Sequence, residues 1–241
     1  MLHLHNLSIR REQAGSVFEL QVPQLDVTPG QLVVVVGDSG CGKSTLLDVL
    51  SLVMQPSRAE TFSMCFGESR SEVVDILGAW HAAREAELAR LRREHMGYIL
   101  QTGGLLPFLT VQANLCLPAR IKGVQGYAGQ VQKLSERLGI AQCLTRKPAA
   151  LSIGQRQRAA IVRALAHDPD LVLADEPTAS VDKARAGQII QDLQTVTREH
   201  NTAVVLVTHD ADLVTDADTI YGFELEQMAE GTVRAFCRRV H

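Results

Sequence analysis

A glycine-rich run that directly follows a short apolar stretch constrains the fold of this chain more than any other feature. The apolar stretch, residues 32–36, reads LVVVV and predicts a buried strand. The run itself consists of Gly37, Asp38, Ser39, Gly40, Cys41, Gly42, Lys43, Ser44 and Thr45. Glycines let such a loop curl until successive backbone N–H groups point inward, and a helix starting at its end adds the positive end of its dipole. The sequence therefore predicts a loop that binds the phosphate groups of a nucleotide.

Two side chains at the end of this loop suit a triphosphate and its metal ion. Lys43 supplies a positive charge for the β and γ phosphates, and the Ser44 hydroxyl is placed to bind Mg²⁺. The alternative is that the pattern occurs by chance, but a chance match directly after a predicted strand is rare. Loops of this kind occur in several classes of nucleotide-binding protein, so the reaction must be inferred from other parts of the chain.

Two adjacent carboxylates end a second apolar stretch. Residues 171–174 read LVLA and are followed by Asp175 and Glu176. A buried strand that delivers Asp at its carboxyl end is the second half of a phosphate-loop site, where the carboxylate holds Mg²⁺. Glu176 reaches further toward the γ phosphate, where it can accept a proton from an attacking water. The alternative, an ordinary acidic turn after a strand, carries almost no weight beside the phosphate loop.

The third feature is the start of an apolar helix. Residues 151–158 read LSIGQRQR, residues 159–166 continue as an apolar helix, and Pro169 ends it. Ser152 is expected to be the N-cap, which places it with Gly154 and Gln155 at a helix N-terminus. The sequence therefore predicts a second anion-binding surface, far from the first along the chain.

Two single residues complete the pattern: Gln101 follows the strand-like residues 98–100, and His209 ends the strand-like residues 203–208. Together, and in this order, the motifs resemble those of the ATP-binding cassette (ABC) ATPases, from about residue 4 to about residue 233. The resemblance implies an α/β fold of the P-loop NTPase type. We expect an ABC-type core with a mostly parallel sheet, an N-terminal antiparallel β subdomain and an inserted α-helical subdomain.

The resemblance also implies that the chain hydrolyses ATP with Mg²⁺, and that two copies pair head to tail around two ATP molecules. Residues 37–45 would hold the phosphates from one copy. The residues expected to cap the same ATP from the other copy are Ser152, Gly154 and Gln155. Each site would then be incomplete in a single copy, so hydrolysis would depend on dimerisation.

Within that arrangement each remaining motif has an implied role. The residues expected to serve the metal are Ser44, Gln101 and Asp175. The residues expected to act on the γ phosphate are Glu176 as general base, His209 as its contact and Gln101 as its sensor. Residues 179–182 look like the loop through which the two sites communicate, and Asp182 is included among the nucleotide-binding residues.

Two departures from the family pattern limit this transfer. Ile153 occupies the position where the family usually has the first of two glycines. Either the helix starts there with ordinary geometry and the Ile153 side chain points away from the γ phosphate, or the capping of ATP by these residues is weakened. The family also commonly stacks an aromatic residue on adenine, but residues 7–12 contain none. Arg10 or Arg11 could present a guanidinium plane to the base instead, and a solvated charged turn is the alternative.

We expect one ABC ATPase domain over residues 1–241, with a core formed by about 1–101 and 166–241 and a helical signature subdomain over about 102–165. Strand-like alternation covers residues 1 to about 30 and residues 62–66, and the composition of residues 82–93 predicts a helix. From residue 170 onward strands and helices alternate, which favours a parallel sheet, and a final hairpin is expected through 221–225 and 231–233.

Composition limits the partners and the location. The net charge of −3 gives no reason to expect a nucleic-acid partner, and no apolar run has the length of a membrane span. The cysteines are odd in number and share no metal-type spacing, which fits a reducing compartment. Beside these limits, the resemblance implies a protein of the cytoplasm that lies peripherally on the inner face of the cell membrane, with an integral-membrane permease as partner.

The residues around Gln101 indicate a branch of the family. Residues 89–98 and 102–115 resemble the exporters that include lipoprotein-release and macrolide-efflux ATPases, and the leucines and Phe108 after Gln101 could receive a short helix of a permease. Burial of these residues within the cassette is the alternative. A different class also stays open, namely a soluble, non-transport ABC ATPase such as one that works in iron–sulfur assembly.

Overall fold

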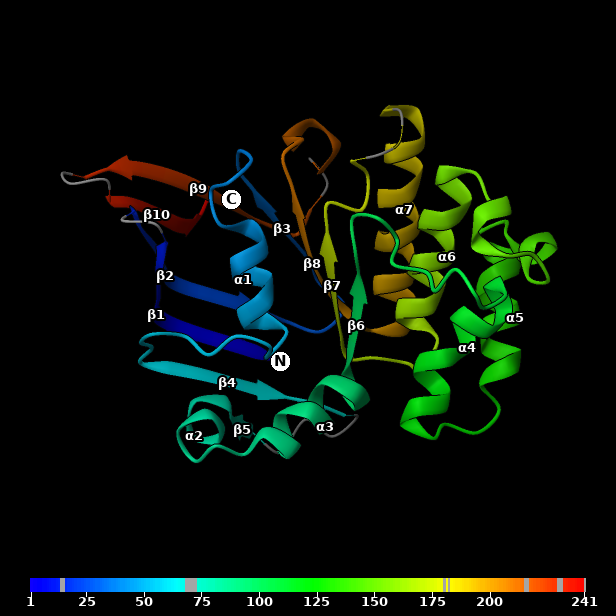
Figure 1. Cartoon of the computed structure of the whole chain (residues 1–241), viewed down its shortest axis with the longest axis horizontal. Helices are drawn as coiled ribbons and strands as arrows, with labels where there is room; N and C mark the ends of the chain where they lie inside the picture. The colour runs from blue at the N-terminus through cyan, green and yellow to red at the C-terminus, as the bar shows by residue number, and fades with distance from the viewer. Residues whose placement is uncertain are drawn as a thin grey trace.

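The computed structural model describes residues 1–13, 16–67, 73–179, 181, 183–214, 217–228 and 232–240. Its strands form one ten-stranded sheet, flanked by helices on both faces (Figure 1). The strands are β1 (Leu2–Gln13), β2 (Ser16–Val27), β3 (Leu32–Val36), β4 (Thr61–Cys65), β5 (Val73–Asp75), β6 (Met96–Ile99), β7 (Leu171–Asp175), β8 (Ala203–Thr208), β9 (Thr219–Gln227) and β10 (Thr232–Arg239). The helices are α1 (Lys43–Leu50), α2 (Ile76–His81), α3 (Glu85–His95), α4 (Val111–Lys122), α5 (Tyr127–Arg137), α6 (Ile153–Leu165) and α7 (Lys183–His200). Three short 3-10 turns, η1 (Ala141–Cys143), η2 (Pro148–Ala150) and η3 (Ala211–Val214), complete the set in the described residues.

The sheet has a parallel half and a largely antiparallel half. Its strand order is β5-β4-β1-β2-β10-β9-β3-β8-β7-β6, and the pairs from β9 to β6 are all parallel. Strands β5, β4, β1 and β2 pair antiparallel, and β10 joins β2 in parallel and β9 in antiparallel orientation. The expected fold class, a P-loop ABC-type core with an N-terminal antiparallel part and an inserted helical part, is confirmed.

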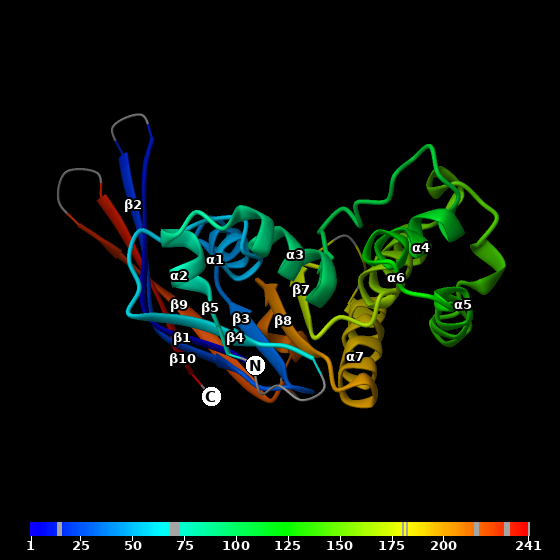
Figure 2. The same ribbon diagram turned by 90° about the horizontal axis from the view of Figure 1, so that it is seen from below.

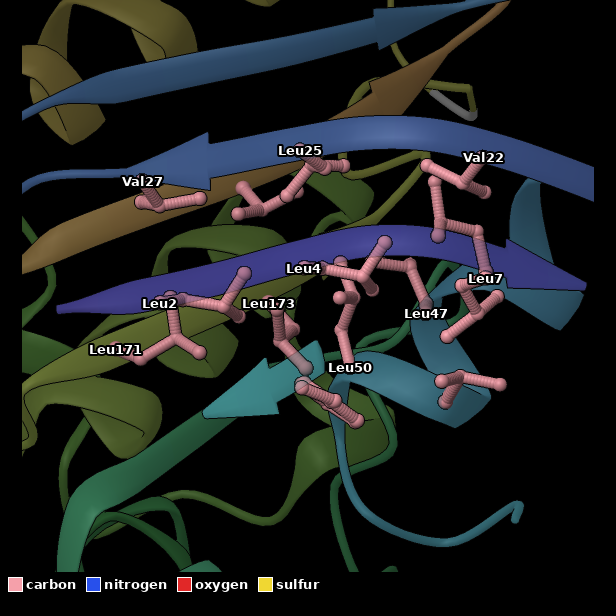
Figure 3. Packing of buried hydrophobic residues seen from close by; sticks show 14 of the residues in the cluster. Leu2, Leu4, Leu7, Val22, Leu25, Val27, Leu47, Leu50, Leu171 and Leu173 are labelled. Carbon is pink, nitrogen blue, oxygen red and sulfur yellow. The ribbon is translucent and has the colours of Figure 1, made fainter. Parts of the chain in front are cut away.

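The burial of the parallel strands explains their composition. Strands β3, β7 and β8 are buried along almost their whole length, as strands covered on both faces must be. Alternate residues serve two hydrophobic cores: Val33 and Val35 face the core under α1, while Leu32 and Val34 face the core under α6 and α7. Figure 3 shows part of the first core, where the leucines of α1 meet those of β1.

Helices α4, α5 and α6 gather on the far side of β7 from α1 in both views (Figures 1 and 2). They pack against one another, and α6 also lies on β6 so closely that a Cβ at Gly97 would come within 2.3 Å of the Ala164 carbonyl oxygen. Helix α6 therefore belongs to both the helical part and the sheet-covering layer. The subdomain boundaries at about 102 and 165 stay a prediction.

Most expected elements have their expected places, including β4 and the β9–β10 hairpin. The helix predicted over 82–93 was placed too early, because α3 spans Glu85–His95. Residues 82–84 instead turn the chain after α2, which Asp75 caps through Gly78 N, and Ala83 takes a positive φ of 50° that is incompatible with a helix. None of the helices in the described ranges is long and apolar enough to cross a membrane.

Candidate nucleotide site

The glycine-rich loop connects the end of β3 to the start of α1, as the sequence predicts. Gly40 and Gly42 have φ values of 81° and 110°, which side chains other than glycine adopt at a cost. Gly42 is also the N-cap of α1, and a Cβ there would lie 2.8 Å from Cζ of Phe18 on β2. The loop thus needs glycine for two reasons, its backbone conformation and the aromatic ring that lies against it.

A cavity of about 820 Å³ opens in front of this loop. Its lining residues are Arg11, Ser16, Val17, Phe18, Ser39, Gly40, Gly42, Lys43, Ser44, Thr45, Gln101, Asp175, Glu176 and Val233. The carboxyl ends of β3 and β7 and the N-terminus of α1 meet at this cavity, which is where open α/β sheets bind ligands. The loop, the acidic pair and Gln101, which are separate in the sequence, therefore share one cavity.

Lys43 is almost fully buried and is held by oxygen atoms. Its Nζ donates to the carbonyl oxygens of Gly37 at 2.7 Å and Asp38 at 2.9 Å, and it lies 3.4 Å from Oε1 of Glu176. The loop backbone thus fixes the position of the ammonium group, and the carboxylate neutralises its charge.

Ser44 and Asp175 bring two oxygen donors together at the end of the cavity. Ser44 Oγ donates to Asp175 Oδ2 at 3.4 Å. Burial raises the pKa of Asp175 above its usual value, and the carboxylates of Glu176 and Asp48 add to this, whereas Ser44 and Lys43 act in the opposite direction. A carboxylate that is costly to ionise gains most from a nearby cation, and the hydroxyl and carboxylate oxygens are ligands of the kind that Mg²⁺ prefers. This donor set fits Mg²⁺.

Glu176 stands at the centre of the polar network. Besides its contact with Lys43, its Oε2 accepts from Nδ1 of His209 at 3.1 Å. Its backbone has a positive φ of 42°, which is uncommon for a residue with a side chain, and Glu176 N donates to Val207 O at 3.0 Å. An unusual backbone conformation therefore holds this carboxylate between the ammonium group and the imidazole.

The segment after Gln101 is fastened to α6 by its backbone. Gln157 donates from Nε2 to Gln101 O at 2.8 Å, and Arg163 donates to the carbonyl oxygens of Gly103 and Gly104. Both donors are on α6, and Gln157 is 2% exposed. Sequence reasoning missed these two residues, because their spacing on a helix reads only as amphipathic. The side chain of Gln101 itself is exposed and lines the cavity.

The second predicted anion-binding surface lies at the N-terminus of α6. Ser152 is the N-cap and accepts from Gln155 N at 3.2 Å, and Gln155 Oε1 accepts from Ser152 N at 3.0 Å, so the two form a capping box. Ile153 is the first helical residue, has no positive φ and is 45% exposed. The backbone of Ile153 therefore agrees with the first of the two hypotheses, that the helix starts there with ordinary geometry.

Some of the predicted nucleotide-binding residues, among them those at the start of α6, do not line the cavity of their own chain. The nucleotide-binding candidates that are absent from its lining are Gly37, Asp38, Cys41, Ser152, Gly154 and Gln155. His209 does not line it either, but reaches it through Glu176. Cys41 is buried behind the loop, and burial raises the pKa of its thiol. Ser180 and Asp182, expected in the communicating loop, lie outside the described residues.

The structure separates the two candidate arginines. Arg11 lines the cavity, whereas Arg10 pairs with Glu12 on the exposed part of the hairpin at 2.7 Å. The cavity also has three apolar lining residues that the sequence did not suggest, Val17, Phe18 and Val233. Val17 and Phe18 are on β2 and Val233 is on β10, so only the pairing of these two strands brings them together, and no local sequence signal indicates that pairing.

The glycine-rich loop on β3, the buried lysine, and the Ser44–Asp175 and Glu176–His209 pairs define a phosphate-loop ATPase. The sequence profile described as "ABC transporter" matches residues 20–179, which is more than half of the chain. The chain belongs to the ABC transporter family.

Individual relatives agree with this assignment. The chain is 37% identical over 199 residues to the lipoprotein-releasing system ATP-binding protein LolD of Acinetobacter baylyi, covering 81% of this chain and 82% of that protein. It is 36% identical over 208 residues to the macrolide export ATP-binding/permease protein MacB of Rhodopseudomonas palustris, covering 86% of this chain but only 30% of that protein. The dimeric structure of MJ0796, a bacterial ABC transporter cassette, has a TM-score of 0.76 and 28% identity, covering 97% of this chain and 96% of that one.

Proposed function

We propose that this chain is the ATP-binding and ATP-hydrolysing subunit of an ABC transporter, and that it dimerises on ATP to drive a separate membrane permease of the export or lipoprotein-release type. The observation that carries the proposal is the placement of Lys43, Asp175 and Glu176 around one cavity in front of the loop. The lipoprotein-releasing and macrolide-export names of the relatives support the transport branch.

The chemistry assigned to the site is attack of water on the γ phosphate of ATP. Glu176 accepts the proton of that water, because it is the carboxylate nearest to Lys43, which binds the β and γ phosphates. His209, already hydrogen-bonded to Glu176, contacts the γ phosphate from the same side. Gln101 lines the same cavity and senses whether the γ phosphate is present.

The residues that would hold Mg²⁺ are Ser44 and Asp175, with Gln101 as a third oxygen donor. The ion would neutralise charge that develops on the phosphate oxygens. Ser44 also orients the Asp175 carboxylate through its hydroxyl, and Asp175 gains from the cation because burial makes its own charge costly.

A second copy of the chain would complete each site. Ser152, Gly154 and Gln155 lie at the N-terminus of α6, outside the lining of the cavity of their own chain, and backbone N–H groups of a helix N-terminus bind anions. In the dimer they would cap the ATP held by residues 37–45 of the other copy, and Asp182 would lie between the two sites. The dimeric structure of MJ0796 supports the pairing of two copies.

A groove beside the Gln101 segment suits the permease. It has a volume of about 480 Å³ and is lined by residues of α3, β6, α4 and α6, among them Leu117 and Ile121, and by Leu106 of the loop between β6 and α4. Arginines border it, and one of them, Arg163, is the residue that holds the backbone of Gly103 and Gly104. A short helix with an apolar face and acidic ends would fit this groove and would touch the segment that follows the γ-phosphate sensor.

The residues expected in that docking patch divide between core and surface. Leu105 packs against the second hydrophobic core, Leu106 lines the groove, and Phe108 is 69% exposed. The permease would hold the chain peripherally on the cytoplasmic face of the membrane. The soluble, non-transport alternative is not favoured, because the relatives named above are transport proteins.

The test uses the tagged Glu176→Gln variant with ATP, in membranes solubilised from cells that make every native partner. The variant should retain ATP, form a stable dimer and co-purify an integral-membrane protein that mass spectrometry identifies. Lys43→Ala is the matched control, because it carries the same tag but lacks the phosphate contact. Recovery of only soluble partners with an intact dimer would contradict the transporter assignment.

A further inference from the structure

Gln157 of α6 is a long polar side chain in a buried position. It is 2% exposed, and its Nε2 donates to the carbonyl oxygen of Gln101 at 2.8 Å. Its Oε1 is buried beside Gly103, 3.7 Å from the place that a Cβ on Gly103 would take, and has no hydrogen-bond partner among the described residues. One half of the amide is therefore paired and the other half is not.

An amide in this state does not serve stability alone. A buried acceptor without a partner costs more free energy than one neutral hydrogen bond contributes, and an apolar side chain of the same size would avoid that cost. Natural sequences break such local rules mainly where function requires it. The contact of Gln157 with Gln101 therefore needs a functional explanation.

The contact acts on the peptide group of Gln101. Leu100 O accepts from Gly103 N at 2.8 Å, so residues 100–103 form a turn in which Gln101 is the second residue. The carbonyl of Gln101 points to α6, while its side chain is exposed and lines the nucleotide cavity. Because the carbonyl and the side chain leave the same residue, a fixed carbonyl restricts the directions in which the side chain can extend.

The other anchors of this segment lie further along the chain. Arg163 holds the carbonyl oxygens of Gly103 and Gly104, and these two glycines have positive φ values of 75° and 58°. Glycine tolerates many backbone conformations, so an anchor at Gly103 or beyond leaves the orientation of Gln101 open. The amide of Gln157 is the anchor at Gln101 itself.

We propose that Gln157 is a positioning residue, whose amide N–H holds the Gln101 carbonyl and thereby directs the Gln101 side chain toward the γ phosphate. The proposal deepens the proposed function and rests on it, because it assumes that Gln101 senses that phosphate. Gln157 does not line the nucleotide cavity, whereas Lys43, which binds the phosphates, does. Loss of the Gln157 contact should therefore slow turnover and leave the affinity for ATP nearly unchanged.

The experiment compares Gln157→Met with the wild type in the purified full-length chain. Methionine has nearly the same size and no N–H donor, so the kcat of ATP hydrolysis should fall roughly tenfold. The dissociation constant of ATP, measured by calorimetry in EDTA, should stay within about twofold of the wild-type value. The midpoint of urea denaturation should be equal or higher, because the unpaired Oε1 is gone.

A double-mutant cycle with Gln101→Ala separates positioning from a structural role. If Gln157 acts through Gln101, Gln157→Met should have no further effect on kcat in the Gln101→Ala background. Gln157→Glu would place a carboxylate oxygen against the Gln101 carbonyl and should lower kcat at least as far as Gln157→Met. Gln130→Met is the matched control, because Gln130 Nε2 also donates to a backbone carbonyl, that of Leu165 at 3.4 Å, but Gln130 does not line the nucleotide cavity.

Wild-type turnover in Gln157→Met would overturn the positioning role, and so would an equal fall of kcat with and without the Gln101 side chain. A parallel loss of turnover, ATP affinity and stability would make Gln157 a purely structural residue. Wild-type turnover in Gln101→Ala would remove the sensor from the proposed function, and the role of Gln157 with it. If the wild-type chain binds no ATP, the proposed function itself fails.

Discussion

The ammonium group of Lys43 lies 3.4 Å from the carboxylate of Glu176, and both side chains are largely buried. The residue proposed to bind the γ phosphate is therefore paired with the residue proposed as general base. On the proposed function, a phosphate that enters the loop would bring its own negative charge to Lys43 and would release Glu176 to face water. The ion pair thus keeps both charges compensated where isolated charges would be costly.

Glu176→Gln should stop turnover while ATP binding stays equal or becomes tighter. The amide cannot accept the proton of the attacking water, so kcat should fall by roughly 10² to 10⁴. It also no longer competes with the phosphate for Lys43. The measurements are kcat at saturating ATP and equilibrium ATP binding. Glu226→Gln, at an exposed position on β9, is the control, and a Glu176→Gln variant that hydrolyses ATP normally would remove Glu176 from its proposed role.

Arg163→Lys should lower kcat more than ATP affinity. A lysine cannot donate to both the Gly103 and Gly104 carbonyl oxygens, so the segment after Gln101 loses part of its attachment to α6. The loss of one buried, charge-assisted contact costs about 1.5–3 kcal/mol of stability. Steady-state kinetics beside a direct binding titration separate the two effects. Equal changes in kcat and affinity would mean that Arg163 only supports the fold.

Ile121→Asp should abolish co-purification of the permease without changing ATP binding. Ile121 is 59% exposed and lines the groove next to Arg163, so a buried carboxylate at the interface would replace an apolar contact. Val240→Asp is the control, because Val240 is equally apolar and 65% exposed but lies at the end of β10. If both variants retain the permease, the groove is not its docking site.

The local motifs of this chain were predictable because each of them is short and its chemistry is contained in its own residues. The loop from Gly37 to Thr45 needs only its glycines and the strand before it, and the N-cap at Ser152 needs only the helix that follows it. The parallel half of the sheet could be predicted because apolar strand patterns alternate with helix patterns along the chain.

Features that depend on pairing between distant strands were not predictable. Arg10 and Arg11 are adjacent in sequence, and only the register of β1 against β2 and of β2 against β10 decides which of them faces the cavity. The contact of Arg163 with Gly103 and Gly104 likewise depends on how α6 lies on β6. The late start of α3 has a local cause, the left-handed backbone of Ala83, which helix propensity does not report.

Gly97→Ala should destabilise the fold, because the added Cβ would lie 2.3 Å from the carbonyl oxygen of Ala164. The backbone of α6 or of β6 would have to move to make room, which separates the two elements. This lowers the free energy of unfolding by about 1–3 kcal/mol or more. Gly129→Ala in α5 is the matched control, since nothing lies within 4 Å of its Cβ, and it should be neutral or stabilise by about 0.5–1 kcal/mol. Chemical denaturation of both variants measures the difference, and similar stabilities would contradict the close packing of α6 on β6.

The stability of the fold should fall below pH 6.5 because of His167, which is 2% exposed. Burial is the largest cause that lowers the pKa of His167 to about 4, and the charges of Lys122 and His95 lower it further. The hydrogen bond to Met96 O and the nearby carboxylate of Asp168 raise the pKa, but by less. The unfolded chain, with a histidine pKa near 6.5, therefore binds a proton that the folded chain excludes between pH 6.5 and 4.

The stabilisation is complete above pH 6.5 and is lost as the pH falls toward 4, with about 2 kcal/mol lost by pH 5. His167→Gln keeps an N–H donor for Met96 O but cannot titrate, so its free energy of unfolding should fall less between pH 7.5 and pH 5 than that of the wild type. Urea denaturation of both proteins at the two pH values measures this difference and cancels the titration of the other groups. Parallel losses in the two proteins would show that His167 is not the group responsible.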